Sequence, residues 1–255
     1  LNIAERRLPQ DGRMKSSILG KDVDFRVATT PSLHGEGAVI RLLMRSGALL
    51  SLDELGMSSD ATTAIRAAIR KPNGITLVAG PTGSGKTTTL YAALRDIVSS
   101  ELKLVSVEDP VEYEIDGVSQ IQVRPNIGLD FARSLRSILR QDPDVLMIGE
   151  IRDRETATIT IEAALTGHTV LSTIHTNSAP ATVTRLLEMG VPNYLISSTL
   201  SAVIAQRLVR RLCENCAEPT PAPPEFIQLA GDSAIADTPT FRAGVGCTQC
   251  AGTGF

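Results

Sequence analysis

Residues 75–88 read ITLVAGPTGSGKTT, and this stretch decides the fold. An uninterrupted apolar run, Ile75 to Ala79, precedes the pattern GxxxxGK[ST], and helix-forming residues follow it. Glycines let such a loop turn its N–H groups inward, and the first turn of the helix adds positive potential. The stretch therefore predicts a strand, a phosphate-binding loop and a helix. The predicted loop consists of Gly80, Pro81, Thr82, Gly83, Ser84, Gly85, Lys86, Thr87 and Thr88.

Two side chains of this loop predict its chemistry. Lys86 can bridge the β and γ phosphates of a nucleotide, and the hydroxyl of Thr87 can hold Mg²⁺. The alternative is a Gly-rich turn with an exposed lysine. The strand before the loop and the helix after it favour the nucleotide site.

Short apolar runs alternate with amphipathic helical segments from Ile75 to Ile174. Strands that are apolar throughout are typical of a parallel sheet with helices on both faces. We therefore expect a doubly wound α/β domain. The Asp-Gly pair inside YEIDGVSQIQV (113–123) predicts an antiparallel hairpin, and residues 193–209 are expected to be helical.

Acidic residues follow two more of the predicted strands. Glu150 directly follows DVLMIG (144–149), and KLVSVE (103–108) ends at Glu108, with Asp109 and Glu112 close behind. Ligands of a doubly wound sheet lie beyond the carboxyl ends of its strands, so these acids are expected to converge on the phosphates. Glu150 suits a water-mediated metal contact, and a carboxylate of the other group can take a proton from an attacking water. The alternative is a set of solvated strand ends.

Two of the three histidines bracket another apolar strand in GHTVLSTIHTN (167–177). His175 follows the strand, at the edge where the acids gather, and can donate to a γ-phosphate oxygen. His168 precedes the strand, and a purely structural hydrogen bond is an equal alternative for it.

All four cysteines lie in two CxxC pairs that are separated by thirty residues. Each pair forms a chelating turn, and two such turns make a tetrahedral thiolate cage that suits Zn²⁺. The proline-rich insert between them cannot fold alone, so the metal is expected to hold it together. Reduced thiols, disulfides and an iron–sulfur cluster are the alternatives. The predicted ligands are Cys213, Cys216, Cys247 and Cys250.

Composition argues against several classes of function. The net charge of −3, with five Phe, three Tyr and no Trp, speaks against a nucleic-acid surface or a base-stacking platform. The longest uncharged runs are rich in Thr, Ser and Asn, so we expect no membrane insertion. The opening Leu-Asn and the end just after a cysteine pair suggest an excised fragment.

Four parts are expected along the chain. Residues 1–48 are the C-terminal part of a small α+β domain with alternating strands, and residues 49–73 are a linker and a helix. Residues 74–212 form the P-loop core, and residues 213–255 form the metal-binding subdomain. Arginines that could face the nucleotide recur at helical spacing in Arg133, Arg136 and Arg140, although basic helix faces are usually just solvated.

Taken together, the motifs resemble the secretion ATPase family of type II secretion and type IV pilus systems. GPTGSGKTTTLYAAL resembles its Walker A box, VEDPVEYEIDG its aspartate box, LRSILRQDPDVLMIGEIRDRETA its Walker B box and TGHTVLSTIHTN its histidine box. The two CxxC pairs are similar to those of assembly and secretion members, and retraction members lack them. NIAERRLPQDGR is most similar to the type II secretion branch, and the resemblance covers essentially the whole chain.

The resemblance implies a P-loop NTPase core of the RecA-like type that hydrolyses ATP with Mg²⁺. It implies that Glu112 activates water, that Glu108 and Asp109 support metal and water, and that Glu150 is the Walker B acid. His175 belongs to the histidine box. Arginines of the preceding domain are implied to approach the nucleotide when the domains close, namely Arg13, Arg26 and Arg41.

The resemblance also implies a cytoplasmic homo-hexamer, peripheral at the inner membrane, that powers pseudopilus assembly. A missing N-terminal domain is implied to bind an inner-membrane secretion-platform protein. A type IV pilus assembly ATPase or a DNA-uptake relative is the alternative within the family. A scaffold that binds nucleotide without hydrolysing it is the alternative from another class.

Overall fold

The apolar run before the loop forms strand β4 (Gly74–Ala79) of the computed structural model, and β4 is buried along its whole length. It lies inside a six-stranded sheet of order β6-β5-β7-β8-β4-β9, in which neighbouring strands are all parallel. The expected parallel α/β architecture is therefore confirmed. The other strands are β5 (Leu104–Glu108), β6 (Val118–Gln122), β7 (Val145–Ile148), β8 (Thr169–Ile174) and β9 (Leu200–Ala205).

The structure describes residues 1–18, 21–44, 50–222 and 241–255. It divides into two compact units, residues 1–207 and residues 208–255. The expected boundary between residues 48 and 49 lies outside the described residues.

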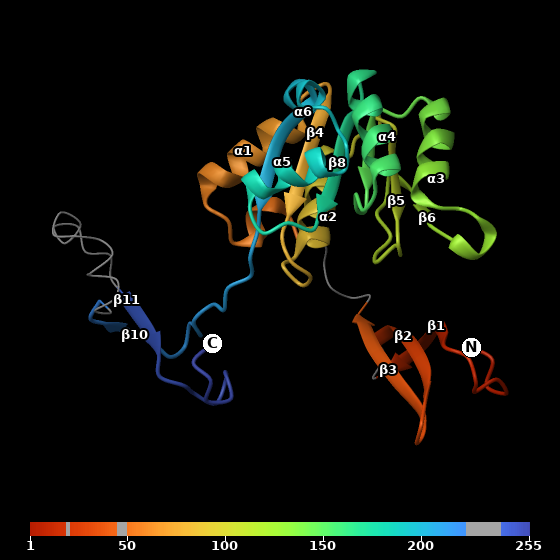
Figure 1. Ribbon diagram of the computed structural model, residues 1–255. Coiled ribbons are helices and arrows are strands. Elements are labelled where there is room, and N and C mark those ends of the chain that lie inside the picture. The colour runs from red at the N-terminus through yellow and green to blue at the C-terminus, as the bar shows by residue number, and fades with distance from the viewer. Residues whose placement is uncertain (19–20, 45–49, 223–240) are drawn as a thin grey trace. The chain divides into compact units, whose positions relative to one another are not determined.

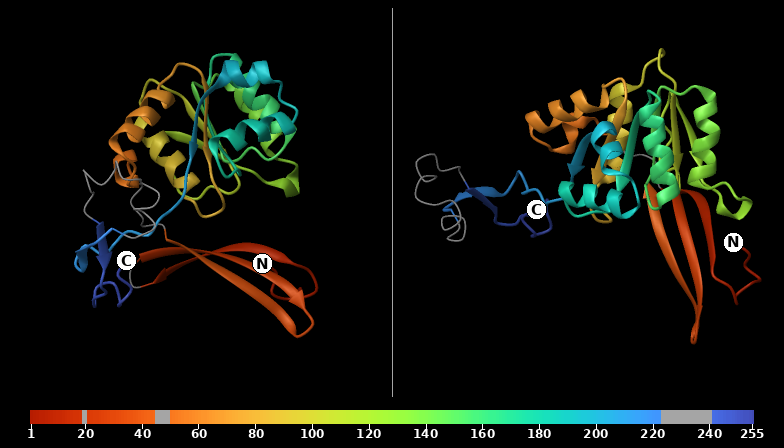
Figure 2. Two further views of the ribbon diagram at one scale, coloured as in Figure 1. Left: turned by 60° about the vertical axis from the view of Figure 1, so that its left-hand side comes forward. Right: turned by 45° about the horizontal axis from the view of Figure 1, so that its top comes forward.

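Helices cover both faces of the sheet (Figures 1 and 2). On β4, Ile75 and Leu77 point into one apolar core, whereas Val78 points into the other. The first core is completed by α3 (Phe131–Ile138), α4 (Arg154–Leu165), α5 (Ala179–Glu188) and α6 (Asn193–Thr199). The second core is completed by η1 (Leu52–Leu55), α1 (Ser59–Ile69) and α2 (Lys86–Ile97). Short 3-10 turns η2 (Pro125–Ile127) and η3 (Leu139–Gln141) flank α3.

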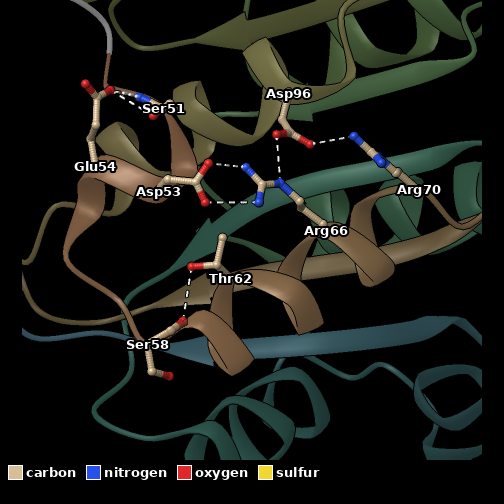
Figure 3. A network of polar contacts seen from close by, with 8 residues as sticks. All are labelled: Ser51, Asp53, Glu54, Ser58, Thr62, Arg66, Arg70 and Asp96. Carbon is tan, nitrogen blue, oxygen red and sulfur yellow. Dashed lines mark hydrogen bonds and ion pairs between the residues drawn. The ribbon is translucent and has the colours of Figure 1, made fainter.

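A polar network joins α1 to the helix that follows the phosphate loop (Figure 3). The guanidinium of Arg66 contacts Asp53 at 2.7 Å and Asp96, on α2, at 3.0 Å. Arg70 reaches the second carboxylate oxygen of Asp96 at 3.0 Å. These hydrogen bonds raise the pKa of Arg66 and lower the pKa of Asp53. The network fixes η1 and α1 against α2.

The first residues form a separate antiparallel sheet of β1 (Gln10–Ile18), β2 (Lys21–Ser32) and β3 (Gly35–Met44). Its register places Arg13 opposite Arg26, and Arg26 opposite Arg41. Directly opposed residues of antiparallel strands share a face, so the three arginines form one row.

Two details of the expected topology are wrong. Residues 113–123 form no hairpin, because β6 pairs with β5 in parallel and the turn at Asp116 and Gly117 only leads into β6. The helix expected over 193–209 ends at Thr199, and β9 follows. Pairing with β4 satisfies the backbone hydrogen-bonding groups of Leu200–Ala205, and this outweighs the helical pattern of these residues.

The second unit contains a two-stranded antiparallel ribbon, β10 (Ala217–Thr220) and β11 (Phe241–Gly244). Within the same unit, the guanidinium of Arg210 lies 3.8 Å from the centre of the Phe255 ring. None of the helices in the described ranges is both long and apolar enough to span a membrane.

Candidate functional site

The phosphate loop joins the carboxyl end of β4 to the first turn of α2. Gly83 and Gly85 have φ angles of 78° and 85°, a left-handed conformation that side-chain-bearing residues avoid, and Gly85 is the N-cap of α2. The Nζ of Lys86 donates to the carbonyls of Gly80 at 2.9 Å and Pro81 at 3.0 Å. Burial lowers the pKa of Lys86, and the negative charge of Glu150 opposes this effect.

All strands of the large sheet run in the same direction, so their carboxyl ends gather at one edge. A pocket of about 470 Å³ lies at this edge. The predicted site residues that line it are Thr82, Gly83, Gly85, Lys86, Thr87, Thr88, Glu108, Asp109, Glu112, Glu150, His175, Arg26 and Arg41. Gly80, Pro81 and Ser84 shape the loop without lining the pocket, and the side chain of Ser84 is buried.

Glu150 follows β7 and is largely covered, with a side chain that is 16% exposed. Its two oxygens contact different partners, because Arg152 donates to Oε2 at 2.7 Å and His175 lies 3.1 Å from Oε1. Arg152 also reaches Asp109 at 3.5 Å. The pKa of Arg152 is raised, chiefly by its hydrogen bond to Glu150.

Glu108 and Glu112 stand in different surroundings although both line the pocket. Glu108 is 2% exposed, and its carboxylate accepts hydrogen bonds from Tyr91, Ser106 and Gln120. Glu112 is half-buried, and among the described residues only its backbone N–H makes a polar contact, which is with the Tyr91 hydroxyl at 3.1 Å. Glu108 is thus occupied by protein donors, whereas the carboxylate of Glu112 is available to a ligand.

The remaining candidates divide into those near the pocket and those elsewhere. Arg13 does not line the pocket, but its Nη2 donates to the carbonyl of Val111, next to Glu112, at 3.3 Å. His168 lies at the opposite edge of the sheet, where its Nδ1 contacts the carbonyl of Ala163 at 2.8 Å. This contact fits the alternative in which His168 makes a purely structural hydrogen bond. The helical arginines do not line the pocket either, and Arg136 pairs with Glu155.

Three residues of the site were not predicted from the sequence: Arg152, Tyr91 and Gln206. The side chain of Gln206 accepts from Thr89 and donates to the carbonyl of Ser84, each at 2.7 Å, so it holds the phosphate loop. A glutamine directly after an apolar run, as at Gln206, is a sequence signal for a polar side chain at the end of a strand. The expected helix over 193–209 concealed it.

The second unit brings the four cysteine sulfur atoms within 4.8 Å of one another. Three of the Sγ–Sγ distances, including that between Cys213 and Cys247, are 3.8 Å. Four sulfurs arranged tetrahedrally at about 2.3 Å from one metal ion lie about 3.8 Å apart, so this cluster can hold a metal. Backbone N–H groups of Cys247 and Gly254 donate to the sulfur of Cys250, each at 3.2 Å. These hydrogen bonds, chiefly the one from the N–H of Cys247, lower the pKa of Cys250 to about 6. The lowered pKa favours the thiolate, which is the form that ligates metals.

A parallel α/β sheet with a phosphate loop and a carboxylate-lined pocket at its carboxyl edge defines a P-loop nucleotide-binding protein. Within that class, the chain belongs to the family Type II/IV secretion system protein, whose match covers residues 1–255.

Relatives in this family are similar over most or all of the chain. Type II secretion system protein E of Xanthomonas campestris pv. campestris is 57% identical over 228 residues, which are 89% of this chain and 40% of the relative. Type II secretion system ATPase E of Vibrio cholerae serotype O1 is 52% identical over 255 residues, all of this chain and 50% of the relative. The chain therefore spans about half the length of these relatives or less.

A solved structure supports the same fold. The crystal structure of the pilus retraction motor PilT with bound ADP aligns with a TM-score of 0.68 at 30% identity, and covers 80% of this chain and 60% of that one. The likeness to a secretion and pilus ATPase fold is thus shown in sequence and in structure.

Proposed function

We propose that this chain is the nucleotide-hydrolysing part of a secretion motor that converts ATP and water to ADP and phosphate. The observation that supports this most is the pocket at the carboxyl edge of the sheet, where the phosphate loop meets Glu112 and Glu150. The relatives named as a type II secretion ATPase and a pilus retraction motor support the same activity.

In this proposal each side of the pocket has its own task. The N–H groups of Gly83 and Gly85, with Lys86, bind the phosphates. Thr87 and Glu150 are the residues that would hold Mg²⁺, which neutralises the phosphate charge when it is bound. His175 bonds to Glu150 and orients it toward the phosphates.

Glu112 is the proposed general base because, within the described part of the chain, it is the pocket carboxylate that no protein donor contacts. A carboxylate in that position can take the proton of the attacking water. Arg26 and Arg41, which also line the pocket, are proposed to offset the charge that develops on the phosphates, and Arg13 to steady the segment beside Glu112.

The cysteine cluster is proposed to bind one Zn²⁺ in a closed structural site. The four sulfurs lie within 4.8 Å of one another and three of their spacings are 3.8 Å, which suits four thiolates around Zn²⁺, and no further ligand is needed. The metal would hold the turns around Cys213 and Cys247 together when it is bound.

We further propose that six copies of the protein form a ring at the cytoplasmic face of the inner membrane and drive pseudopilus assembly. The relatives named for type II secretion support this assignment over a pilus role. We expect the protein to restore secretion when it is expressed in a secretion-deficient strain, and not to restore pili in a pilus-deficient strain.

The decisive test is phosphate release by the purified protein held as a hexamer by fusion to a hexameric scaffold. We expect steady turnover that is at least about tenfold faster per chain than in dilute unfused protein, because an arginine from a neighbouring subunit completes such sites. Tight ATP binding without phosphate release by the hexamer would support a nucleotide-dependent scaffold instead.

A further inference from the structure

Glu108 lines the pocket, but its carboxylate is engaged with protein donors. It is 2% exposed, and three donors from three elements reach its carboxylate. These donors are the hydroxyl of Tyr91 on α2, the hydroxyl of Ser106 on β5 at 2.5 Å and the amide of Gln120 on β6 at 3.0 Å. A buried carboxylate that accepts this many hydrogen bonds serves as a fixed anchor.

Tyr91 connects this anchor to the segment that carries Glu112. Its hydroxyl donates its one hydrogen to Glu108, so its lone pairs are left to accept. They accept the backbone N–H of Glu112 at 3.1 Å and that of Tyr113 at a weaker 3.5 Å. Burial and the charge of Glu108 raise the pKa of Tyr91, which keeps the hydroxyl protonated as a donor.

Gln120 holds the same segment from the other side. Its side-chain amide donates to the carbonyl of Tyr113 at 3.0 Å and accepts from the N–H of Ile115 at 2.7 Å. The segment 112–115 is therefore held at four backbone groups by two side chains, and both side chains bond to Glu108.

Tyr91 also stands on the helix that begins at Lys86, the phosphate-binding lysine. It is 1% exposed, and its ring packs edge-on against that of Tyr113 with centroids 6.1 Å apart. A shift of this helix would move the Tyr91 hydroxyl, which accepts the backbone N–H of Glu112, because the helix and its buried side chains move as one body.

We propose that Tyr91 is a positioning residue for hydrolysis, which couples the phosphate-binding helix to Glu112 through the buried anchor Glu108. The proposal rests on the proposed role of Glu112 as general base. It assigns Glu108 to the support of this coupling and not to contact with metal or water.

The test is Tyr91→Phe, which removes one oxygen and keeps the ring. Turnover of the hexamer should fall by about tenfold to hundredfold, because displacing a catalytic base by up to about 1 Å slows the reaction by up to about that factor. ATP affinity should stay within about twofold, since Lys86 and Thr87 are untouched. Tyr194→Phe is the matched control, because Tyr194 is 66% exposed on α6, and it should leave turnover unchanged.

A double-mutant cycle separates positioning from a general structural effect. On the background of Glu112→Gln, Tyr91→Phe should cost nothing further, because the base that it positions is already gone. Equal losses on both backgrounds, or a loss of ATP affinity with normal turnover, would overturn the proposal.

Gln120→Ala tests the same coupling if Tyr91→Phe does not fold. This substitution removes the hydrogen bonds of Gln120 to the backbone of Tyr113 and Ile115. It should show the same fall in turnover with unchanged ATP affinity. A Gln120→Ala protein with full turnover would likewise overturn the proposal. If Glu112→Gln alone leaves turnover intact, it is instead the role proposed for Glu112 that fails.

Discussion

The glutamates around the pocket differ in their partners more than in their sequence context. Glu150 accepts from Arg152 and lies beside His175, Glu108 is enclosed by three donors, and Glu112 presents its carboxylate to the pocket. Burial and hydrogen bonding decide whether a carboxylate can exchange protons or serves only as an anchor. These differences are the basis for assigning the proton transfer to Glu112.

Lys86 provides the simplest test at the residue scale. Lys86→Ala should reduce ATP binding and turnover by on the order of 10²-fold, because the lysine is proposed to supply the positive charge that binds the phosphates. Titration with a fluorescent nucleotide and a phosphate-release assay measure the two effects. Lys71→Ala is the control, since Lys71 is exposed in the turn before β4. Wild-type binding by Lys86→Ala would show that the nucleotide lies elsewhere.

The sequence was sufficient to predict the residues of the phosphate loop and the acids at the strand ends. These depend on local patterns, namely a glycine motif between an apolar run and a helix, and a carboxylate directly after a strand. The division of labour among the acids depends on partners distant in sequence. Tyr91 approaches Glu108 across 17 positions and Gln206 approaches Ser84 across 122, and no local pattern reveals such contacts.

At the scale of elements, sheet pairing decided the two features that local propensity misjudged. β9 pairs with β4 although its residues continue the pattern of a helix, and β6 pairs in parallel with β5 although Asp-Gly precedes it. In both cases the edge of an existing sheet offers backbone hydrogen bonds that a short helix or hairpin would have to replace. The β9 pairing is also what brings Gln206 to the phosphate loop.

The two cysteine turns of the second unit are predicted to depend on a metal. Pure protein should contain about one zinc per chain, and Cys216→Ser should lower that content and loosen the unit. Elemental analysis and proteolysis of the isolated variant measure the two effects. Thr248→Ala, an exposed change between two of the cysteines, should leave both unaltered. Four titratable thiols in a metal-free, protease-resistant protein would contradict the zinc site.

At the scale of the whole molecule, this chain matches about half of its relatives' length and includes the phosphate loop and the acids that line the pocket. The row of arginines on β1–β3 and the acids of the sheet edge carry opposite charges. Arg26 and Arg41 of this row are proposed to act at the chain's own pocket, and in the proposed ring an arginine from a neighbouring subunit completes the site. The proposed motor action thus depends on assembly as well as on the pocket.

The central claim is that Glu112 takes the proton of the attacking water at this pocket. The most direct measurement is a single-turnover experiment with labelled ATP on the hexamer carrying Glu112→Gln, with Glu114→Gln, at an exposed position of the same segment, as the control. The Glu112→Gln protein should bind ATP as tightly as the wild type and return it unhydrolysed, with cleavage slowed at least about a hundredfold. Glu114→Gln should cleave normally. Cleavage by Glu112→Gln at the wild-type rate would contradict the claim.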